Sequence, residues 1–391
     1  MKKIKILHIL QSANAMSVYS GNESIFFPLI LGLSEKEEFD ITLVIPGYNA
    51  ALKKNTSGNI TLHYINFRKK NFFKDIFRLK KILASSDFDI IHTHGTLSNF
   101  IIYLLCLATG KKYADLICSS RNKILFSKYM EYSKKIKQDF ISLIEKKLMN
   151  FNDFNICTGK NIKSDYLFLG IHPGKLNLIE PAVDYSSGAV AEETIKKIRA
   201  KIIGVFSTTI KIVAIFGEFD RLKYGFDIFV KTAQYFKKTF PEIRVKFAVY
   251  GVSEINNLND YLRVQNVSED VAVIDNTFSP EEIIESIDIL VLPYRYSEYP
   301  LSLLKALKHG KPSICSETSA FTDIIRDGAN GFLAPIADYV YFAEKIACLC
   351  NDSEYKKISE EASATNLKKD YETMLSKYSE LYHQYLSNAT K

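Results

Sequence analysis

Short apolar runs alternate with amphipathic stretches along the first half of the chain. The runs are rich in Ile, Val and Leu and have the length of buried strands, whereas the stretches between them repeat apolar residues at helical spacing. This alternation predicts βαβ units and therefore a parallel sheet. The predicted strands are 4–10, 41–45, 60–65, 89–92, 114–118 and 154–157, and the predicted helices include 23–35, 74–85 and 134–150.

The second half repeats the pattern after a break. Residues 184–193 are small and polar, which is typical of a linker between domains. The chain has 391 residues, and single hydrophobic cores stop growing at roughly 250–300 residues. We therefore expect two domains, 1–185 and 195–365, each a doubly wound α/β sheet of the Rossmann type. The strands predicted for the second domain are 211–217, 245–251, 271–274, 287–293 and 312–316.

The last segment, 366–391, has the spacing of an amphipathic helix. Its apolar and aromatic side chains recur at i, i+3, i+4 and i+7. They are Tyr371, Met374, Leu375, Tyr378, Leu381, Tyr382 and Tyr385. Such a helix must cover an apolar surface, and we expect it to cross back to the first domain.

Two domains of this type, facing each other, form a cleft at the carboxyl ends of their strands, where open α/β sheets bind ligands. We therefore expect the chemistry of the protein to lie in loops that follow strands.

Composition excludes several classes of protein. With 47% hydrophobic and 24% charged residues, the chain resembles an ordinary globular protein. Its longest apolar run, 100–108, is well short of the ~18–20 residues that span a bilayer, and the charged start leads into a first strand rather than a signal peptide. The cysteines lie mostly in apolar segments without metal-ligand spacing, so we expect reduced core residues in a cytoplasmic protein. They are Cys106, Cys118, Cys157, Cys315, Cys348 and Cys350.

Positive charge is concentrated in the first half. Residues 1–190 contain 26 Lys and Arg against 16 Asp and Glu, whereas the remainder is slightly acidic. Runs such as 68–70, 111–112 and 134–137 suit an anionic surface such as phospholipid or lipid-linked phosphate, or are ordinary solvated lysines. No nucleic-acid module accompanies the charge, which argues against DNA and RNA as partners.

The most specific motifs lie in the second half. Residues 288–318 read DILVLPYRYSEYPLSLLKALKHGKPSICSET, and residues 322–335 read TDIIRDGANGFLAP. These segments resemble the family-4 retaining glycosyltransferases of the GT-B fold. The signature of that family is a strand ending in L-P-S, an E-x7-E motif across a helix start, A-x-x-x-G-x-P-V-I, and E-I-I-x-D-x-x-x-G. The resemblance spans nearly the whole chain and is strongest from 211 to 335.

The resemblance implies a donor site at the helix start near Glu298. Free N–H groups and the positive end of a helix suit a diphosphate, and a carboxylate there can bind sugar hydroxyls. Glu298 is alternatively a helix-start residue favoured by the dipole alone. The turn itself would consist of Tyr299, Pro300, Leu301 and Ser302. Lys305 occupies the position of the second family carboxylate, which holds the ribose.

A second segment, 217–227, reads GEFDRLKYGFD and resembles the family's G-R-[LF]-x3-K-G-x-D. The Arg and Lys of that motif neutralise the departing diphosphate. Here Glu218 replaces the Arg, and the resemblance assigns donor binding to Gly217, Arg221 and Lys223. The alternative for each cation is an ordinary loop charge.

The first half contributes three further candidates. The turn around Gly21 and Asn22 lies where the family approaches the diphosphate, although a helix cap explains it equally well. The strand 89–95 resembles the family's D-[IV]-[IV]-H-x-H-G, so His94 is our candidate sugar contact, alternatively a core histidine, while His92 is expected to be buried in the core. Arg121 follows the strand 114–118 on the acceptor side.

We therefore expect a cytoplasmic glycosyltransferase that uses a nucleotide diphosphate sugar without a metal or other cofactor. Its acceptor would be a glycan or a lipid-linked sugar in surface polysaccharide assembly (O-antigen, capsule or exopolysaccharide), with peripheral association at the inner membrane face. The alternative is an inactive homologue that binds another glycosyltransferase or the acceptor, which the departures at Glu218 and Lys305 motivate. A sugar-nucleotide epimerase shares the fold class, but residues 298–335 match transferases better.

Overall fold

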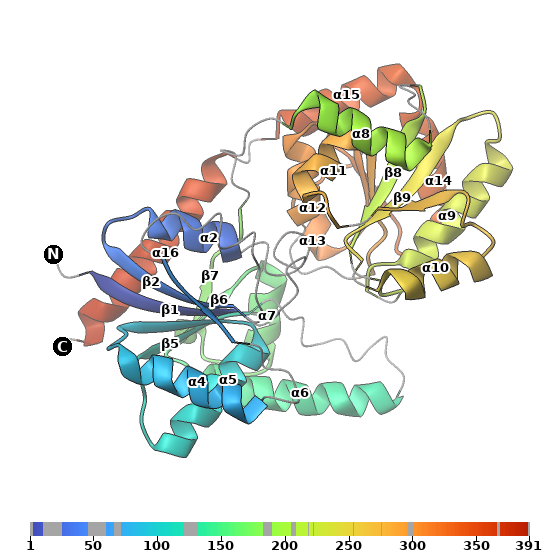
Figure 1. The fold of residues 1–391 in the computed structure, drawn as a ribbon. Helices are drawn as coiled ribbons and strands as arrows, with labels where there is room; N and C mark the ends of the chain where they lie inside the picture. The colour runs from blue at the N-terminus through green and yellow to red at the C-terminus, as the bar shows by residue number, and fades with distance from the viewer. Residues whose placement is uncertain are drawn as a thin grey trace. The chain divides into compact units, whose positions relative to one another are not determined.

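The computed structural model forms two compact units (Figure 1). Of the described residues, those up to 182 and those from 370 onward belong to the first unit, and those from 190 to 369 belong to the second. The structure describes residues 3–10, 26–45, 60–65, 72–120, 132–182, 190–204, 209–217, 219–221, 223–252, 254–274, 276–295, 301–365 and 368–389.

The first unit contains a seven-stranded parallel sheet in the order β3-β2-β1-β4-β5-β6-β7. Its strands are β1 (Ile4–Leu10), β2 (Phe39–Ile45), β3 (Ile60–Tyr64), β4 (Ile90–His94), β5 (Asp115–Ser120), β6 (Phe154–Cys157) and β7 (Leu176–Leu178). The order reverses between β1 and β4, so the chain winds to both sides of β1, as in doubly wound folds.

Helices cover both faces of this sheet. They are α2 (Phe26–Ser34), α4 (Phe72–Ser85), α5 (Thr96–Thr109), α6 (Tyr132–Phe151), α7 (Lys160–Phe168) and α16 (Lys368–Ala389), with a 3-10 turn at Pro173–Lys175. On one face, side chains of α4 and α5 pack against Leu7, Ile9 and Ile91. On the other, Phe26 of α2 contacts His94, and Tyr382 of α16 contacts His92.

The C-terminal helix α16 is bonded to the first unit at several points. Tyr371 donates a hydrogen bond to the carbonyl of Pro28 at 2.9 Å, and Tyr385 donates one to the carbonyl of Asp153 at 3.0 Å. Its apolar residues Met374, Tyr378 and Tyr382 are buried. The buried side chains are those whose spacing over 371–385 predicts an amphipathic helix.

The second unit contains a six-stranded parallel sheet in the order β10-β9-β8-β11-β12-β13. Its strands are β8 (Lys211–Phe216), β9 (Val245–Tyr250), β10 (Val271–Val273), β11 (Ile289–Leu292), β12 (Ser313–Ser316) and β13 (Phe332–Ala334). The strand order again reverses, between β8 and β11, which creates a second switch point at the carboxyl edge.

Helices of the second unit divide between two buried cores, one on each face of the sheet. Side chains of α9 (Phe226–Thr239), α10 (Ile255–Val264) and α14 (Tyr339–Leu349) contribute to one core. Those of α8 (Glu192–Ile203), α11 (Pro280–Ser286) and α12 (Leu301–Lys308) contribute to the other. The remaining helices are α13 (Ser319–Thr322) and α15 (Asp352–Ser363).

The fold confirms the expectation of two doubly wound parallel sheets, and each predicted strand is present. The predicted helix 23–35 is described from Phe26 onward. Two edge strands, β7 and β13, were not predicted. Each has three residues and contains no β-branched residue, whereas the equally short β10 lies in the β-branched run Val-Ala-Val-Ile at 271–274. Among the residues that the structure describes, no helix is long and apolar enough to cross a membrane.

Candidate functional site

The candidate donor site of the second unit lies at the carboxyl ends of β8 and β11. Gly217 follows β8 directly with a φ of 141°, and a Cβ added there would lie 2.9 Å from the ring of Tyr224. The chain then runs through a loop to Gly225, which precedes α9. Glycine is the residue type that suits this φ and this close approach, because it has no Cβ atom. The chain can therefore turn directly at the end of β8.

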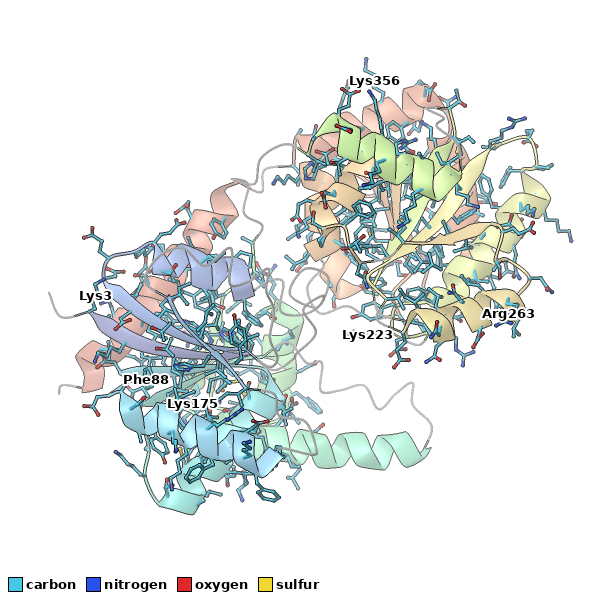
Figure 2. All side chains as sticks on the ribbon, in the orientation of Figure 1. Lys3, Phe88, Lys175, Lys223, Arg263 and Lys356 are labelled. Atoms are coloured by element: carbon cyan, nitrogen blue, oxygen red, sulfur yellow. The ribbon has the colours of Figure 1, made fainter. Side chains whose placement is uncertain are left out.

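Arg221 and Lys223 both belong to this loop, and Figure 2 labels Lys223. Arg221 is exposed, with its guanidinium 5.6 Å from the ring centroid of Tyr261. Lys223 is half-buried, and its ammonium lies 5.1 Å from the ring centroid of Tyr224. The structure therefore brings two predicted donor-binding cations onto one short loop at the carboxyl edge.

Arg295, which follows β11, braces this loop. Its guanidinium donates two hydrogen bonds to the carboxylate of Asp227, at 2.8 and 2.6 Å, and a third to the carbonyl of Arg221. Its backbone N–H donates to the carbonyl of Lys223 at 3.2 Å. Bidentate arginine–carboxylate pairs fix geometry as well as charge. Arg295 thus holds the two cationic residues in place, a role that we did not predict from the sequence.

The start of α12 is tied to the same edge through Tyr294. The buried Tyr294 hydroxyl donates to the carbonyl of Phe216, the last residue of β8, and its side chain also bonds Ser302. Burial, together with the nearby Tyr224, raises the pKa of Tyr294 well above its ordinary value despite the opposing Ser302 bond. The hydroxyl therefore remains protonated at neutral pH, and the predicted donor-site residues Leu301 and Ser302 lie in the first turn of a helix anchored to β8.

Lys305 of α12 is engaged by a carboxylate of the preceding helix. Its ammonium lies 2.5 Å from Glu281, in the first turn of α11. Burial acts to raise the pKa of Glu281, but the charge and the hydrogen bond of Lys305 outweigh it and lower that pKa below its ordinary value. The charge of the predicted donor-binding residue Lys305 is thus compensated by the carboxylate of Glu281.

In the first unit, His94 is the last residue of β4 and lies at the carboxyl edge of its sheet. It is buried, and its Nε2 lies 2.9 Å from Nδ1 of His8 on β1. His92 is buried as well, as we expected, with its ring stacked on that of His94 at a centroid distance of 4.2 Å. Burial is the main cause that lowers the pKa of each of the three histidines, so all are neutral at pH 7.

These three histidines are the residues in the described part of the chain that could hold a metal ion, since their nitrogens lie within 4.8 Å of one another. The spacing of His, Cys, Asp and Glu along the sequence indicates no cluster of metal ligands, so this cluster was not predicted. The cause is spatial: β1 and β4 are neighbours in the sheet, so His8 lies beside His92 although 84 positions separate them. Two signals together would have predicted this cluster. The doubly wound strand order places β1 beside β4, and the alternation of side chains along a strand places His92 and His94 on the same face.

The remaining predicted site residues lie outside the described part of the chain. They are Gly21, Asn22, Arg121, Glu298, Tyr299 and Pro300. Glu218, which departs from the family motif, also lies outside the described part. The six cysteines form no disulfide. Burial raises the pKa of Cys118 and of Cys157 to about 12, so these thiols are inert core groups.

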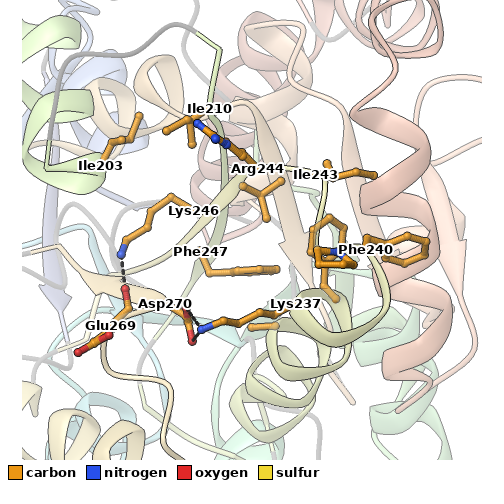
Figure 3. A pocket seen from close by; sticks show the side chains of 14 residues that line it. Ile203, Ile210, Lys237, Phe240, Ile243, Arg244, Lys246, Phe247, Glu269 and Asp270 are labelled. Carbon is orange, nitrogen blue, oxygen red and sulfur yellow. Dashed lines mark hydrogen bonds and ion pairs between the residues drawn. The ribbon is translucent and has the colours of Figure 1, made fainter.

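A separate hollow of the second unit lies at the opposite, amino edge of the sheet (Figure 3). It has a volume of about 310 Å³ and is lined by residues such as Ile210 and Val245, which lie at the starts of β8 and β9. Its lysines are engaged: Lys237 bonds Asp270 at 2.8 Å, and Lys246 bonds the carbonyl of Glu269. Ligands of doubly wound sheets bind at the carboxyl edge, so this hollow is not part of the candidate site.

Comparison with known proteins agrees with the fold and the motifs. The family model "Glycosyl transferases group 1" matches residues 210–352, and "Glycosyltransferase Family 4" matches residues 28–187. An uncharacterized 41.2 kDa protein in the cps region of Klebsiella pneumoniae is 25% identical over 370 residues, which cover 91% of this chain and 96% of that protein.

A second relative is the UDP-Gal:alpha-D-GlcNAc-diphosphoundecaprenol alpha-1,3-galactosyltransferase of Escherichia coli. It is 22% identical, with 90% of this chain and 89% of the relative covered. Among solved structures, Anabaena HepE in complex with UDP and glucose superimposes with a TM-score of 0.76 at 14% identity, covering 97% of this chain and all of that one. The chain belongs to the glycosyltransferases of the GT-B fold, with a Family 4 domain in its first half and a group 1 domain in its second.

Proposed function

We propose that this glycosyltransferase moves a sugar from a nucleotide diphosphate sugar to a glycan or lipid-linked acceptor during surface polysaccharide assembly, with retention of the anomeric configuration. The observation that carries the proposal is the braced loop of the second unit, in which Arg295 and Asp227 fix Arg221 and Lys223 at the carboxyl edge. Two cations held on one short loop suit a diphosphate, whose negative charge grows as the sugar departs.

In this proposal the chemistry is electrostatic. Arg221 and Lys223 neutralise the leaving diphosphate, and the first turn of α12, Leu301 and Ser302, presents backbone N–H groups to it. Such a site needs no metal ion and no other cofactor, since protein cations supply the positive charge. In this proposal Glu281, whose carboxylate pairs with Lys305, accepts hydrogen bonds from hydroxyls of the donor.

His94, in the first unit, is proposed as a contact to a sugar substrate. It ends β4 at the carboxyl edge, and its Nδ1 has no hydrogen-bond partner among the described residues although it is buried. A buried polar atom without a partner costs free energy, and a sugar hydroxyl would supply the missing bond. Glu298 and the turn through Pro300 complete the donor site in this proposal.

The nature of the acceptor is inferred from relatives and from charge. The Escherichia coli relative is named for an acceptor on diphosphoundecaprenol, and the first half of this chain carries the basic excess. We therefore favour a lipid-linked acceptor at the inner membrane face. Cosedimentation with vesicles containing about 30% anionic lipid at low salt checks this association, which should weaken as salt screens the lysines. Equal binding to neutral vesicles would contradict it.

Turnover and stereochemistry test the proposal as a whole. The purified protein would be incubated with UDP-, GDP- and dTDP-sugars and short-chain polyprenyl diphosphate glycans, with product formation followed by mass spectrometry. Proton NMR of the product would then identify the new anomeric bond. Retention predicts that the anomeric configuration of the donor is preserved. An inverted product would contradict retention alone. If no product forms, and no nucleotide raises the Tm of the protein in a thermal-shift measurement, donor transfer is contradicted and the non-catalytic alternative is favoured.

A further inference from the structure

Three histidines share one buried face of the first sheet, a face that is normally apolar. His92 and His94 are two positions apart on β4 and therefore point to the same side, and the register of β1 with β4 pairs His8 with His92. The exposed fraction is 2% for His94 and zero for the other two. Because buried polar groups are costly unless they are bonded, the bonding of each ring nitrogen determines what this cluster can do.

Both nitrogens of His92 are engaged. Nδ1 lies 2.7 Å from the hydroxyl of Tyr382 on α16, and Nε2 lies 2.7 Å from the hydroxyl of Ser119 on β5. A neutral imidazole has one N–H and one lone pair. One hydroxyl therefore accepts from His92 and the other donates to it, which uses the full capacity of the ring. His92 forms a fixed surface against which His94 stacks.

The bond between His8 and His94 couples the tautomers of the two rings. It joins Nδ1 of His8 to Nε2 of His94 at 2.9 Å. If His8 donates, both rings carry their proton on Nδ1, whereas if His94 donates, both carry it on Nε2. The tautomer of His8 thus determines whether the remaining nitrogen of His94, Nδ1, is a donor or an acceptor.

The same arrangement does not fit a bound metal ion. Two nitrogens that share one tetrahedral zinc lie about 3.3 Å apart, given Zn–N bonds of about 2.0–2.1 Å, whereas His8 and His94 are at hydrogen-bond distance. In addition, the lone pair of His92 is taken by a hydroxyl. The cluster is therefore built as a hydrogen-bonded network.

We propose that His8 is a positioning residue that fixes the tautomer and the ring orientation of His94, so that Nδ1 of His94 meets a hydroxyl of a sugar substrate. Tyr382, on the C-terminal helix, acts one step further out by holding His92 beneath His94. This inference rests on the proposed function of His94 as a sugar contact. It extends that function to two residues, from β1 and α16, that the family motifs do not include.

The packing around His94 supports this role. The ring lies between His92, at 4.2 Å, and Phe26 of α2, at 4.1 Å between centroids, while His8 is bonded to its edge. Three different elements thus confine one side chain, and Nδ1 is its one nitrogen without a partner among the described residues. Preorganised polar groups of this kind cost no reorganisation when the ligand binds.

Nitrogen NMR tests the coupling directly and needs no activity. The protein would be labelled with ¹⁵N-histidine, and long-range ¹H–¹⁵N correlations would distinguish the two tautomers among its seven histidines. Loss of signals in His8→Asn and His94→Asn assigns the pair. We expect His8 and His94 to be neutral, in the same tautomer, and unaffected by EDTA. Opposite tautomers, or a change on addition of EDTA that indicates a metal ion, would overturn the proposal.

Kinetics then test the consequence for turnover. We expect His8→Phe to lower kcat roughly 10- to 100-fold while the Kd for the nucleoside diphosphate changes less than about 3-fold, because the diphosphate contacts lie in the second unit. His8→Asn should recover part of the loss, since its amide can replace the bond to Nε2 of His94. Unchanged kcat in His8→Phe would refute the positioning role.

The pH profile separates positioning from a merely structural role. Burial lowers the pKa of His94, and repulsion by His92 and His8 in their protonated forms lowers it further. Among the described residues, the titratable groups with ring contacts to His92 or His94 are His8, Tyr378 and Tyr382. Replacing His8 by Phe removes one cause of the lowering, so the pKa of His94 should rise and the acidic limb of kcat/KM should move to higher pH. An unmoved limb would contradict the coupling.

Tyr382→Phe, compared with Tyr385→Phe, provides a matched pair on the same helix. Each variant loses one hydroxyl, but Tyr382 bonds His92 whereas Tyr385 bonds the carbonyl of Asp153. We expect a larger loss of Tm in Tyr382→Phe, because it leaves a nitrogen of the buried His92 unpaired, and a lowered kcat in Tyr382→Phe but not in Tyr385→Phe. Equal kcat values would contradict the role of Tyr382. If the wild-type protein transfers no sugar from any donor, the proposed function fails, while the tautomer measurement still decides whether His8 controls His94.

Discussion

A Cβ atom built on Gly225 would lie 2.0 Å from the carbonyl oxygen of Pro293. Gly225 precedes α9 and has a φ of 65°, and Pro293 follows β11. The two segments that carry the candidate donor site therefore touch backbone to backbone. This contact explains physically why the motif of residues 217–227 contains a glycine at this position.

Gly225→Ala should accordingly be severely destabilising. The left-handed conformation alone costs an alanine about 1–2 kcal/mol, and the clash with Pro293 adds to it because a backbone carbonyl cannot turn aside. Gly328→Ala is the matched control, since Gly328 has a φ of 70° and open space around its Cβ position. Chemical denaturation should show a clearly larger loss of unfolding free energy at Gly225. Equal losses in the two variants would contradict the close contact.

Arg295→Lys should weaken donor binding without removing a charge from the site. Lysine cannot make the bidentate pair with Asp227 and at the same time reach the carbonyl of Arg221. We expect a stability loss of about 1–3 kcal/mol and a higher Kd for nucleoside diphosphates, because the cationic loop loses its brace. Arg263→Lys, at an exposed site on α10, is the control. Unaltered nucleotide affinity in Arg295→Lys would argue against a bracing role.

Lys305→Met should reverse the pH dependence of the contribution that Glu281 makes to the free energy of unfolding. In the wild type, the lowered pKa of Glu281 stabilises the fold above the ordinary value of 4.5, and this contribution is lost as pH falls through the lowered pKa. Without Lys305, burial raises the pKa of Glu281 above 4.5, so protonation at low pH favours the folded state.

The stability difference between wild type and Lys305→Met should therefore shrink between pH 7 and pH 4, from about 1–3 kcal/mol at neutral pH. Thermal unfolding by circular dichroism across this range measures it. Glu281→Gln provides a control, because removing the carboxylate removes its titration. A difference independent of pH would show that the pair does not couple as the structure indicates.

Metal removal should leave transfer unchanged. The proposed mechanism neutralises the diphosphate with Arg221 and Lys223, and the histidine cluster is bonded internally. Dialysis against EDTA followed by activity assays, with and without added Mg²⁺ or Mn²⁺, checks this expectation. Loss of activity that a divalent cation restores would contradict a metal-free mechanism.

Much of the fold follows from patterns that operate within one segment. Strand β1 and strand β8 are apolar runs bounded by polar residues, and α16 follows from the spacing of Tyr371 to Tyr385. Such signals depend on which side of each element is buried, and the spacing of apolar residues within the element indicates that side. Strands β7 and β13 could not be predicted, because Leu-Asn-Leu and Phe-Leu-Ala lack the β-branched residues that identify the equally short β10.

The site was less predictable because its important pairs come from separate elements. Lys305 and Arg221 were visible as charges, but nothing in their spacing identifies Glu281 or Arg295 as partners. For His8, the sequence predicts only a place in a strand, because its contacts with His92 and His94 form only when β1 pairs with β4. The sequence thus identified loops at strand ends, and the structure identified the braces that hold them.

Isothermal titration calorimetry of UDP, GDP and dTDP with the wild type and the Arg221→Ala/Lys223→Ala variant tests donor binding most directly. Lys237→Ala, which removes a cation beside the hollow at the amino edge of the same sheet, is the control (Figure 3). We predict that at least one nucleoside diphosphate binds the wild type and the control with similar Kd, and the double variant at least 10-fold more weakly. Equal affinity in the double variant, or binding lost only in the control, would contradict a donor site at the carboxyl ends of β8 and β11.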